Sequence, residues 1–320
     1  MEKIIAGIDI GGTNTEIGIV ALNGKITYRE KMSTRNHGSD FNAYLTDLVN
    51  LIKLTAGKCG NTELAGIGIG APNGNYLHGT IERAPNLEWE EVVPICELMS
   101  VFFPGIPIKL TNDANAAAMG EMLFGAAKGF SDFVTITLGT GVGSGVVCNG
   151  QLVYGHDGFA GEIGHTIVYP NGRLCGCGRY GCIEAYLSAS GIAKTAAELM
   201  VKYRTPSVLG DIPFNSITSK DIYDAAVNGD WLAKEVFKIS GETMGFKLAD
   251  IVATTSPKAI FFTGGVAMAG DILLKPIKES MEKHLLPIFQ NKVEILASGL
   301  PGTDVAILGA AALVLENKID

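Results

Sequence analysis

One pattern of strands and turns occurs twice in this sequence, and such a repeat restricts the fold to two similar halves. The first copy reads IIAGIDIGGTNTEIGIVALNGKITY and ends at Tyr28, and the second reads FVTITLGTGVGSGVVCNGQLVY and ends at Tyr154. Alternating apolar residues predict strands, and Asn-Gly between apolar runs predicts a hairpin turn. We therefore expect two related β-meander units, with hairpins at Asn23 and Gly24 and at Asn149 and Gly150.

Helical periodicity alternates with short apolar runs in the rest of the chain. A helix is expected after each copy, at 41–57 and 186–203, because apolar residues recur there at helical spacing. Further helices are expected at 114–127, 231–252, 271–285 and 304–316, and further strands at 64–70, 106–111, 259–264 and 293–297. This alternation indicates the α/β class. Two related lobes imply a cleft between them, and such clefts bind small molecules.

Composition limits the classes of function. The chain has 320 residues, which favours two domains or lobes, and it is 47% hydrophobic and 18% charged, as folded globular proteins are. Its net charge of -8 argues against nucleic acid as the main partner. No apolar stretch is long enough to span a bilayer, and the start MEKIIAGIDIGG does not have the pattern of a signal peptide. We expect a cytoplasmic protein without a membrane partner.

Two glycine-rich turns, one in each copy, are candidates for phosphate binding. Glycines let backbone N–H groups approach an anion closely, and a threonine hydroxyl adds a donor. Neither turn has the Rossmann or the Walker A pattern. The alternative is that both are tight hairpin turns that need positive φ. The candidate residues are Gly11, Gly12 and Thr13 in the first turn, and Gly139, Thr140 and Gly141 in the second.

Two acidic positions are candidates for chemistry. Asp9 stands at the first glycine turn, where a carboxylate beside phosphates commonly holds Mg²⁺; the alternative is a turn-stabilising Asx residue. Asn112 and Asp113 lie between a strand and a helix, so Asp113 is expected to cap that helix. A carboxylate there can also accept a proton from a substrate hydroxyl. Glu121, about two turns further along the helix, is expected to be structural.

Several polar side chains are suited to sugar hydroxyls. Asn86 in APNLEW, and Asn73 and Asn75 in APNGNY, offer both a donor and an acceptor, although each can equally be a turn residue. Glu162 and Glu184 flank a cysteine cluster, whose ordered loop could present both acids to a ligand. A surface position is the alternative for each acid.

The cysteine cluster has the spacing of a metal site. Its residues are His165, Cys175, Cys177 and Cys182. One nitrogen and three thiolates complete a tetrahedral Zn²⁺ site and leave no open position, so the metal is expected to be structural. The alternative is a redox or free-thiol cluster. Disulfides are not expected in the cytoplasm, and the isolated Cys59, Cys96 and Cys148 are expected to be packing residues.

These motifs together resemble those of the bacterial sugar kinases of the ROK family (repressor, open reading frame, kinase), within the actin/Hsp70/hexokinase-like ATPase superfamily. DIGGT resembles the first phosphate motif, LGTGVGSG the second, and NDANAAAMGE the segment with the sugar contacts and the catalytic base. GEIGH with CGCGRYGCIE resembles the zinc signature, which is the most specific mark of the family. FFTGGV, with Gly264 and Gly265, resembles the adenosine-contacting segment.

The resemblance implies a fold and a division of the chain. The fold would have two similar ribonuclease-H-like or actin-like lobes around a nucleotide- and sugar-binding cleft. Residues 1–115 would form the smaller lobe, and residues 116–302 would form the larger lobe with the zinc-binding loop. ILGAAAL resembles the closing helix, so a C-terminal helix at about 303–320 would return to the first lobe. A homodimer is also implied.

The resemblance further implies transfer of the γ-phosphate of MgATP to the 6-hydroxyl of a hexose, with Asp113 as the base. The implied sugar-binding residues are Gly74, Asn86, Asn112, Asp113, Glu162, His165 and Glu184. The implied nucleotide-binding residues are Asp9, Gly11, Gly12, Thr13, Asn14, Gly139, Thr140, Gly141, Gly264 and Gly265. His165 would then serve both the zinc and the sugar.

The identity of the hexose follows from smaller details. AGEIGH looks most like the glucokinase branch, which favours glucose, with N-acetylglucosamine as the alternative. Asn73 departs from the glucokinase pattern at APNGNY, where Pro-Gly is usual. A non-catalytic sugar sensor is the second class of function, because some relatives are sugar-responsive repressors. Those have a helix-turn-helix segment before the first phosphate motif, and here that motif begins at Asp9, so we expect a kinase.

Overall fold

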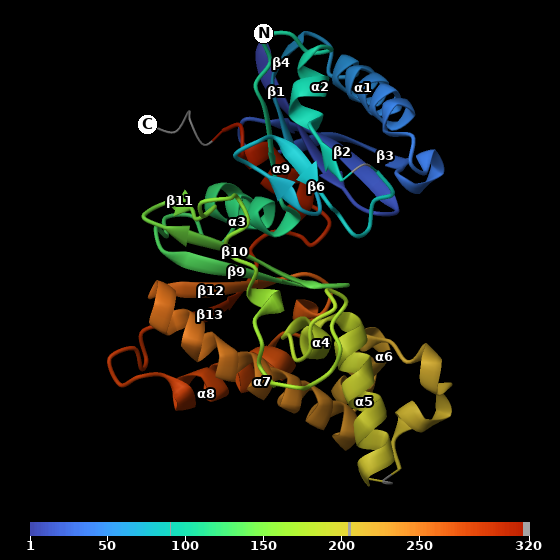
Figure 1. The fold of residues 1–320 in the computed structure, drawn as a ribbon. Helices are drawn as coiled ribbons and strands as arrows, with labels where there is room; N and C mark the ends of the chain where they lie inside the picture. Colours follow the sequence, from blue (N-terminus) through green and yellow to red (C-terminus); the bar gives the residue numbers. More distant parts are fainter. Residues whose placement is uncertain (90, 204–205, 316–320) are drawn as a thin grey trace. The chain divides into compact units, whose positions relative to one another are not determined.

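The computed structural model describes residues 1–89, 91–203 and 206–315. The chain is a mixed α/β protein with two five-stranded sheets and two compact units (Figure 1). Unit 1 comprises Met1–Phe130, Gln151–Gly161 and the described residues from Gly299 on. Unit 2 comprises Ser131–Gly150 and Glu162–Ser298. The α/β class expected from the alternation of strands and helices is confirmed.

The two large sheets have the same strand order, which confirms the repeat. The first sheet runs β3 (Ile26–Ser33), β2 (Asn14–Ala21), β1 (Glu2–Ile10), β4 (Thr62–Gly70) and β8 (Ile108–Thr111). The second runs β11 (Gln151–Leu152), β10 (Val142–Cys148), β9 (Phe133–Leu138), β12 (Ala259–Thr263) and β13 (Glu294–Ala297). In each sheet the first strand of the repeat pairs antiparallel with the second and parallel with a later strand.

Both predicted hairpins form, with different turns. At the second hairpin, Asn149 (φ 52°) and Gly150 (φ 74°) are both left-handed, as a two-residue turn of the Asn-Gly type requires. At the first hairpin only Gly24 is left-handed (φ 86°), and its N–H donates to the carbonyl of Ala21 at 2.9 Å. Residues 22–25 therefore form a longer connection between β2 and β3.

Strand β1 is buried on both of its faces and organises the core of unit 1. Ile8 lies in a cluster with Leu48 of α1 (Phe41–Gly57), whereas Ile5 lies in a second cluster with Ile307 of α9 (Val305–Ala312). A strand with helices on both faces reads as a nearly continuous apolar run, as IIAGIDI does.

Glycines let α9 approach the sheet of unit 1 very closely. A Cβ atom on Gly68 of β4 would lie 1.7 Å from the carbonyl oxygen of Ala310, and one on Gly7 of β1 would lie 2.2 Å from that of Ile307. The other side of α9 packs on α3 (Asp113–Phe124), where Gly309 approaches the carbonyl of Ala116. The C-terminal helix therefore returns to the first unit, as expected. The expected end of that helix, at 316, lies outside the described residues.

The structure divides the chain at places other than those expected. The expected boundary between 115 and 116 falls inside α3, and all of α3 belongs to unit 1 because it packs on α9. Residues 151–161, expected in the second lobe, belong to unit 1. Asn75 donates to the carbonyl of Asp157 at 2.8 Å, and the rings of Tyr76 and Tyr154 stack at 4.1 Å. These contacts hold the segment on unit 1.

The helices of unit 2 pack around the long helix α7. They are α4 (Glu184–Leu187), α5 (Ala189–Tyr203), α6 (Ser219–Val227), α7 (Trp231–Thr255) and α8 (Asp271–His284). The helix expected at 186–203 is therefore two helices, broken at Ser188, whose backbone is extended (ψ 163°) and whose hydroxyl accepts the N–H of Gly191. Helix α7 runs three residues beyond the expected end at Val252 and stops at Ser256 in the left-handed conformation.

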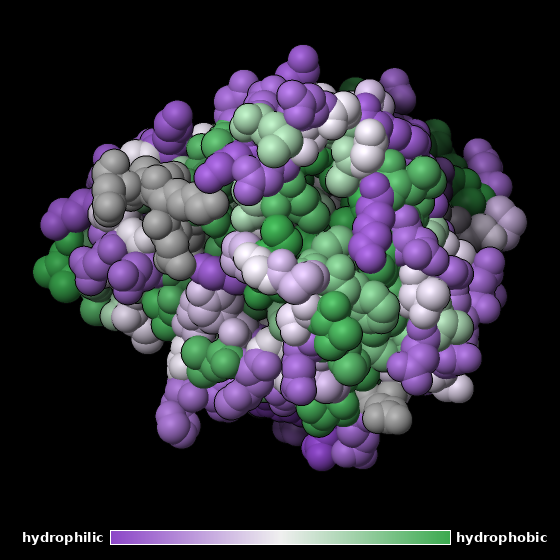
Figure 2. Space-filling view, turned by 90° about the horizontal axis from the view of Figure 1, so that it is seen from above, coloured by the Kyte–Doolittle hydropathy of each residue, from purple (hydrophilic) through white to green (hydrophobic). Residues whose placement is uncertain are grey.

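Smaller elements complete the fold. Unit 1 also has α2 (Ile95–Ser100) and a three-stranded sheet of β5 (Gly74–Asn75), β6 (Thr80–Glu82) and β7 (Val92–Val93). On the face in Figure 2, apolar side chains appear in small groups between polar ones, as is usual because polar atoms cannot cover a whole surface. Within the described ranges, no helix is both long and apolar enough to cross a membrane.

Because α9 lies so close to the sheet, one added methyl group on a strand should lower the stability of the fold strongly. Gly68→Ala should lower the free energy of unfolding by about 2 kcal/mol or more, because the new Cβ overlaps the backbone of Ala310. For a unit of this size the melting temperature should fall by roughly 4–8 °C in a thermal scan. Gly57→Ala is the matched control, since a Cβ there meets nothing within 4 Å. Equal melting temperatures for both variants would contradict this packing.

Candidate functional site

Two acids meet at the carboxyl edge of the first sheet. Asp9 lies near the end of β1, and Asp113 begins α3 directly after β8. The intervening strand β4 ends at Gly70, which pairs with Asp9 on one side and with Thr111 on the other. A Cβ on Gly70 would lie 3.8 Å from the Cα of Asp113, so the start of α3 lies beside the end of β4.

The first glycine turn follows Asp9 and is closed by its own backbone. The N–H of Gly11 donates to the carbonyl of Asn14 at 2.9 Å, and the carbonyl of Thr13 accepts from the N–H of Thr34 at 3.0 Å. A Cβ on Gly12 would lie 2.6 Å from the carbonyl oxygen of Asn86. The loop with the expected sugar residue therefore packs directly on the expected phosphate turn.

A cluster of buried hydroxyl groups supports the first glycine turn. The sequence pattern did not predict this cluster. The hydroxyl of Thr15 lies 2.8 Å from that of Thr34 and 2.8 Å from that of Tyr44, and all three residues are buried. They come from β2, the segment after β3, and α1. The sequence contained no sign of this cluster, because residues far apart in the chain form it.

Asn112, and not Asp113, caps helix α3. The side chain of Asn112 accepts the N–H of Asn115 at 2.6 Å, which corrects the expectation that Asp113 is the capping residue. Asp113 is instead the first residue of the helix, and its Oδ1 accepts the N–H of Ala114 at 2.8 Å. Its side chain is exposed to solvent. Capping by the preceding residue leaves the carboxyl group of Asp113 available for another role.

The two acids have raised pKa values. Burial raises the pKa of Asp9 to about 7, and the negative charges of Asp113 and Glu16 add to this effect. The surrounding protein also raises the pKa of Asp113, although its bond from Ala114 opposes that shift. Asp113 remains open to solvent on one side, while protein encloses it on other sides. Both carboxyl groups bind protons more tightly than a free aspartate does.

The remaining polar candidates of unit 1 differ in their surroundings. Asn86 is exposed, whereas Gly74 is buried, and a Cβ there would lie 2.4 Å from the carbonyl oxygen of Thr111. Asn73 has a left-handed backbone (φ 50°), and its amide donates to the carbonyl of Glu82 at 3.0 Å, so it acts as a turn residue. Glu121 is fully buried and accepts the N–H of Ala126 at 2.9 Å, in agreement with a structural role.

The nucleotide candidates of unit 2 gather at the ends of two parallel strands. The second glycine turn follows β9, and Gly264 follows the neighbouring β12. Gly264 has a positive φ of 94°, and a Cβ there would lie 2.4 Å from the carbonyl oxygen of Leu138. Gly139 and Gly265 have no atom within 4 Å of an added Cβ, so both border open space.

The His and Cys side chains come together as the spacing predicted. Nδ1 of His165 lies 3.7 Å from Sγ of Cys175, and the Sγ atoms of Cys177 and Cys182 are 3.7 Å apart. All four ligand atoms lie within 4.8 Å of one another. Tetrahedral zinc with Zn–S bonds of about 2.3 Å has ligand atoms roughly 3.5–3.8 Å apart. The four residues therefore fit a zinc ion.

The acids beside this cluster have different neighbours. The Oε2 of Glu184 accepts the N–H of Val142 at 3.0 Å, and its Oε1 lies 3.4 Å from the Sγ of Cys175. Glu162 is exposed and precedes the short helical turn that ends at His165. The structure thus places Glu184 between the metal cluster and the second glycine turn.

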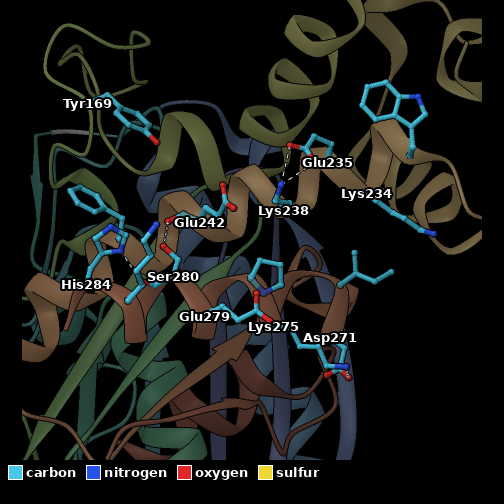
Figure 3. Close-up of a pocket in the computed structure, with 15 residues that line it drawn as sticks. Tyr169, Lys234, Glu235, Lys238, Glu242, Asp271, Lys275, Glu279, Ser280 and His284 are labelled. Atoms are coloured by element: carbon cyan, nitrogen blue, oxygen red, sulfur yellow. Dashed lines mark hydrogen bonds and ion pairs between the residues drawn. The ribbon is translucent and has the colours of Figure 1, made fainter. Parts of the chain in front are cut away.

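A large cavity in unit 2 contains none of the expected sugar or nucleotide residues. This cavity, of about 1010 Å³, lies along α7 and α8, and Figure 3 shows acidic and basic side chains of both helices around it. Lys238 pairs with Glu235, and Lys275 pairs with Asp271. Because these acidic and basic side chains pair with each other, they do not converge on one ligand. We therefore place the candidate site at the two glycine turns.

Each unit contains groups that are suited to a part of phosphate chemistry. In unit 1, an exposed carboxylate with a raised pKa stands beside a second acid and a glycine turn. Such a group can accept a proton, and the neighbouring acid can hold a hydrated cation. In unit 2, a glycine turn borders open space beside a Cys₃His cluster. This combination is suited to phosphoryl transfer, in which positioning and charge stabilisation do most of the work.

Known proteins are similar to this chain over nearly its whole length. A glucokinase of Halalkalibacterium halodurans is 34% identical over 99% of this chain and 96% of that protein. A xylose repressor of Caldicellulosiruptor bescii is 29% identical over 98% of this chain and 79% of that protein. The crystal structure of a ROK family glucokinase from Streptomyces griseus in complex with glucose and AMPPNP is also similar. Its TM-score is 0.79 with 33% identity, over 97% of this chain and 98% of that chain.

The resemblance noted in the motifs extends over nearly the whole sequence, since the model of the ROK family matches residues 5–317. The solved relative has the same two-lobed architecture of the actin-like ATPases. This chain therefore belongs to the ROK family and has its actin-like ATPase fold.

Proposed function

We propose that this protein is an ATP-dependent hexokinase that transfers the γ-phosphate of MgATP to the 6-hydroxyl of a hexose, with glucose as the first candidate. The observation that best supports this proposal is the pair of Asp9 and Asp113 beside the first glycine turn. A sugar sensor would need neither a proton acceptor nor a cation-holding acid at this edge. The similarity to glucokinases over the full chain favours the same activity.

Asp113 is the proposed base. Its carboxylate accepts the proton of the 6-hydroxyl while the hydroxyl oxygen forms a bond to the γ-phosphorus, and the bond from this phosphorus to the bridging oxygen of ADP breaks. Because the surrounding protein raises its pKa, this carboxylate is a stronger proton acceptor than a free aspartate. Asn112 fixes the start of α3 by capping it, and so fixes the position of Asp113.

Asp9 is the proposed partner of the magnesium ion. Burial and the negative charge of Asp113 raise the pKa of Asp9, and a divalent cation beside this carboxyl group would favour its ionised form. When MgATP is bound, the magnesium ion neutralises charge on the phosphates. Asp9 would hold it directly or through water, and backbone N–H groups of the residues 11–14 would contact the phosphates.

The residues proposed for sugar contacts have suitable polar groups. Asn86 and Asn112 of unit 1 and Glu162, His165 and Glu184 of unit 2 have the donors and acceptors that hydroxyl groups need. Gly74 would line the pocket, and its missing side chain allows close packing on Thr111. His165 faces the cysteines with Nδ1, so Nε2, on the opposite edge of the ring, is the nitrogen proposed to bind sugar.

The proposed zinc ion has a structural role. His165 and the three cysteines would occupy all four positions of a tetrahedral ion, so no position is open for a substrate. The loop that carries them turns sharply at Gly178 (φ 84°) and Gly181 (φ 79°). Zinc would therefore fix the loop that presents His165 and Glu184.

Two alternatives have support. N-acetylglucosamine kinase activity is the first, because Asn73 replaces the usual glycine of the glucokinase pattern. A sugar-sensing regulator is the second, because a xylose repressor is 29% identical over 98% of this chain. ADP release from MgATP should be measured with glucose, N-acetylglucosamine, N-acetylmannosamine, mannose and fructose, with a blank without sugar. Glucose-dependent release supports the proposal, and no release with any of these sugars would favour the sensor.

Removal of the proposed base should abolish turnover and spare binding. Asp113→Asn should reduce kcat at least about a hundredfold, because the variant cannot accept the hydroxyl proton. Glucose affinity, measured by calorimetry, should change little. Asp271→Asn is the matched control, since Asp271 is also the first residue of a helix and lies outside the site. A kcat for Asp113→Asn within threefold of the control would rule out Asp113 as the base.

The raised pKa of Asp9 predicts a pH-dependent stability difference. Because the folded-state pKa is about 7 and the unfolded value is 3.8, ionisation of Asp9 increasingly destabilises the folded protein as pH rises between these values. Without Mg²⁺, Asp9→Asn should therefore gain stability over the wild type between pH 5 and pH 8. The gain should be at least about 1 kcal/mol, or roughly 2–4 °C in melting temperature. Asp211→Asn, at an exposed acid, should show no such trend.

Loss of one cysteine should remove zinc and stability together. Cys177→Ser should contain less than one zinc per chain by metal analysis and should melt at a lower temperature, because metal binding contributes directly to folding. Cys59→Ser is the control, since Cys59 lies away from the cluster and should keep both properties. One full equivalent of zinc in Cys177→Ser would contradict the proposed ligands.

A further inference from the structure

We propose that Arg173 is a positioning residue for the second glycine turn and acts on it through the short helix α4. This inference rests on the proposed function, because it assigns the turn at 139–142 to ATP phosphates. It concerns a residue outside the sugar, nucleotide and metal ligands considered so far. Three sets of contacts, all within unit 2, support this role.

Helix α4 is bonded to the glycine turn at both of its ends. At its start, Glu184 accepts the N–H of Val142 at 3.0 Å. Just past its end, the N–H of Ala189 donates to the carbonyl of Gly139 at 2.9 Å. A Cβ on Gly141 would lie 2.7 Å from Oε2 of Glu184, so the carboxylate packs directly against this glycine. The position of α4 therefore fixes the position of the turn.

Arg173 holds α4 and the start of α5 through all five of its guanidinium N–H donors. Nη1 donates to the carbonyls of Ala185 at 3.1 Å and Gly191 at 3.0 Å. Nη2 donates to Thr195 at 3.0 Å and to Glu198 at 2.6 Å. Nε donates to Glu198 at 3.0 Å. Complete use of the donors of a side chain that is only 14% exposed indicates a fixed structural position.

Arg173 also joins α4 to the cysteine loop. Its backbone N–H donates to the hydroxyl of Tyr186 at 2.8 Å, and its guanidinium lies 4.5 Å from the centre of that ring. Tyr186 is part of α4, and Arg173 precedes Cys175 by two residues. One residue thus connects the metal-binding loop with the helix that holds the glycine turn.

The contacts require the geometry of arginine. Bonds to two backbone carbonyls, a hydroxyl and a carboxylate lie in the plane of one guanidinium that also stacks on Tyr186. Lysine has three donors on one nitrogen and no plane to stack, so it cannot replace these contacts. Without Arg173, α4 would lose its contacts through Ala185 and Tyr186, and the turn would then lose its fixed position for phosphate.

The test compares Arg173→Gln and Arg173→Lys with Arg179→Gln, which removes the same charge from an exposed position in the same loop. The first measurement is the Kd of MgADP by calorimetry without sugar. The second is hydrogen exchange of the amides at 139–142 on protein of confirmed zinc content. The third is the KM for ATP and kcat with glucose. Neither the Kd of MgADP nor the hydrogen exchange requires catalysis.

We expect both Arg173 variants to weaken MgADP binding about tenfold and to raise the KM for ATP similarly. We expect faster exchange at 139–142, a smaller change in kcat, and wild-type values for Arg179→Gln. Normal MgADP affinity and normal exchange at the turn in a folded Arg173→Lys or Arg173→Gln would overturn the inference, even if melting temperature or zinc content fell. That pattern would mean that Arg173 stabilises only the loop.

Failure of the proposed function gives a different pattern. If the wild type neither binds MgADP nor phosphorylates any sugar, the kinase proposal fails. The exchange rates at 139–142 still decide the role of Arg173 in that case, because the bonds of α4 to the turn do not depend on a ligand. Should Arg173→Gln fail to fold, Arg173→Lys, which keeps the charge and the aliphatic stem, supplies the same comparison.

Discussion

The parallel pairing of neighbouring strands is the constraint on which both halves of the candidate site depend. Strand β4 pairs parallel with both β1 and β8, so the residues that follow these strands must meet at one edge. Asp9, Gly70 and Asn112 reach that edge from segments that are far apart in the chain. The second sheet repeats the arrangement with β9 and β12, which brings Gly139 and Gly264 together. The duplicated strand order therefore explains why each unit presents a glycine turn.

Close backbone packing converts this common architecture into a specific site. In unit 1, the missing side chain of Gly12 allows the loop of Asn86 to approach the phosphate turn. In unit 2, Gly141 leaves room for the carboxylate of Glu184, and Gly264 approaches Leu138. In these positions a methyl group would displace a neighbouring segment. The glycines thus determine the distances between functional groups, in addition to any contact with phosphate.

The sequence predicted the structural features that local patterns determine. Its predictions failed where contacts between distant segments determine the structure. Both hairpins, the α/β class and the cluster of His165 with three cysteines could be predicted, because spacing within short segments encodes them. The prediction of one helix at 186–203 was wrong at Ser188, because the N–H of Ala189 donates to the carbonyl of Gly139 in the second glycine turn. The cap of α3 was wrong by one residue, since Asn112 and Asp113 are both good capping residues. Tyr44 and Arg173 were missed because their partners are far away in sequence.

The raised pKa of Asp9 means that its ionisation near neutral pH opposes folding in the absence of a cation. Each negative charge at this edge opposes the other, and burial prevents water from relieving the repulsion at Asp9. A protein that only bound a neutral sugar would gain nothing from two such acids. A protein that must hold a cation beside phosphates and remove a proton needs one acid for each task. The unfavourable electrostatics of Asp9 and Asp113 are therefore the strongest physical argument for catalysis, beyond membership of a family that also includes repressors.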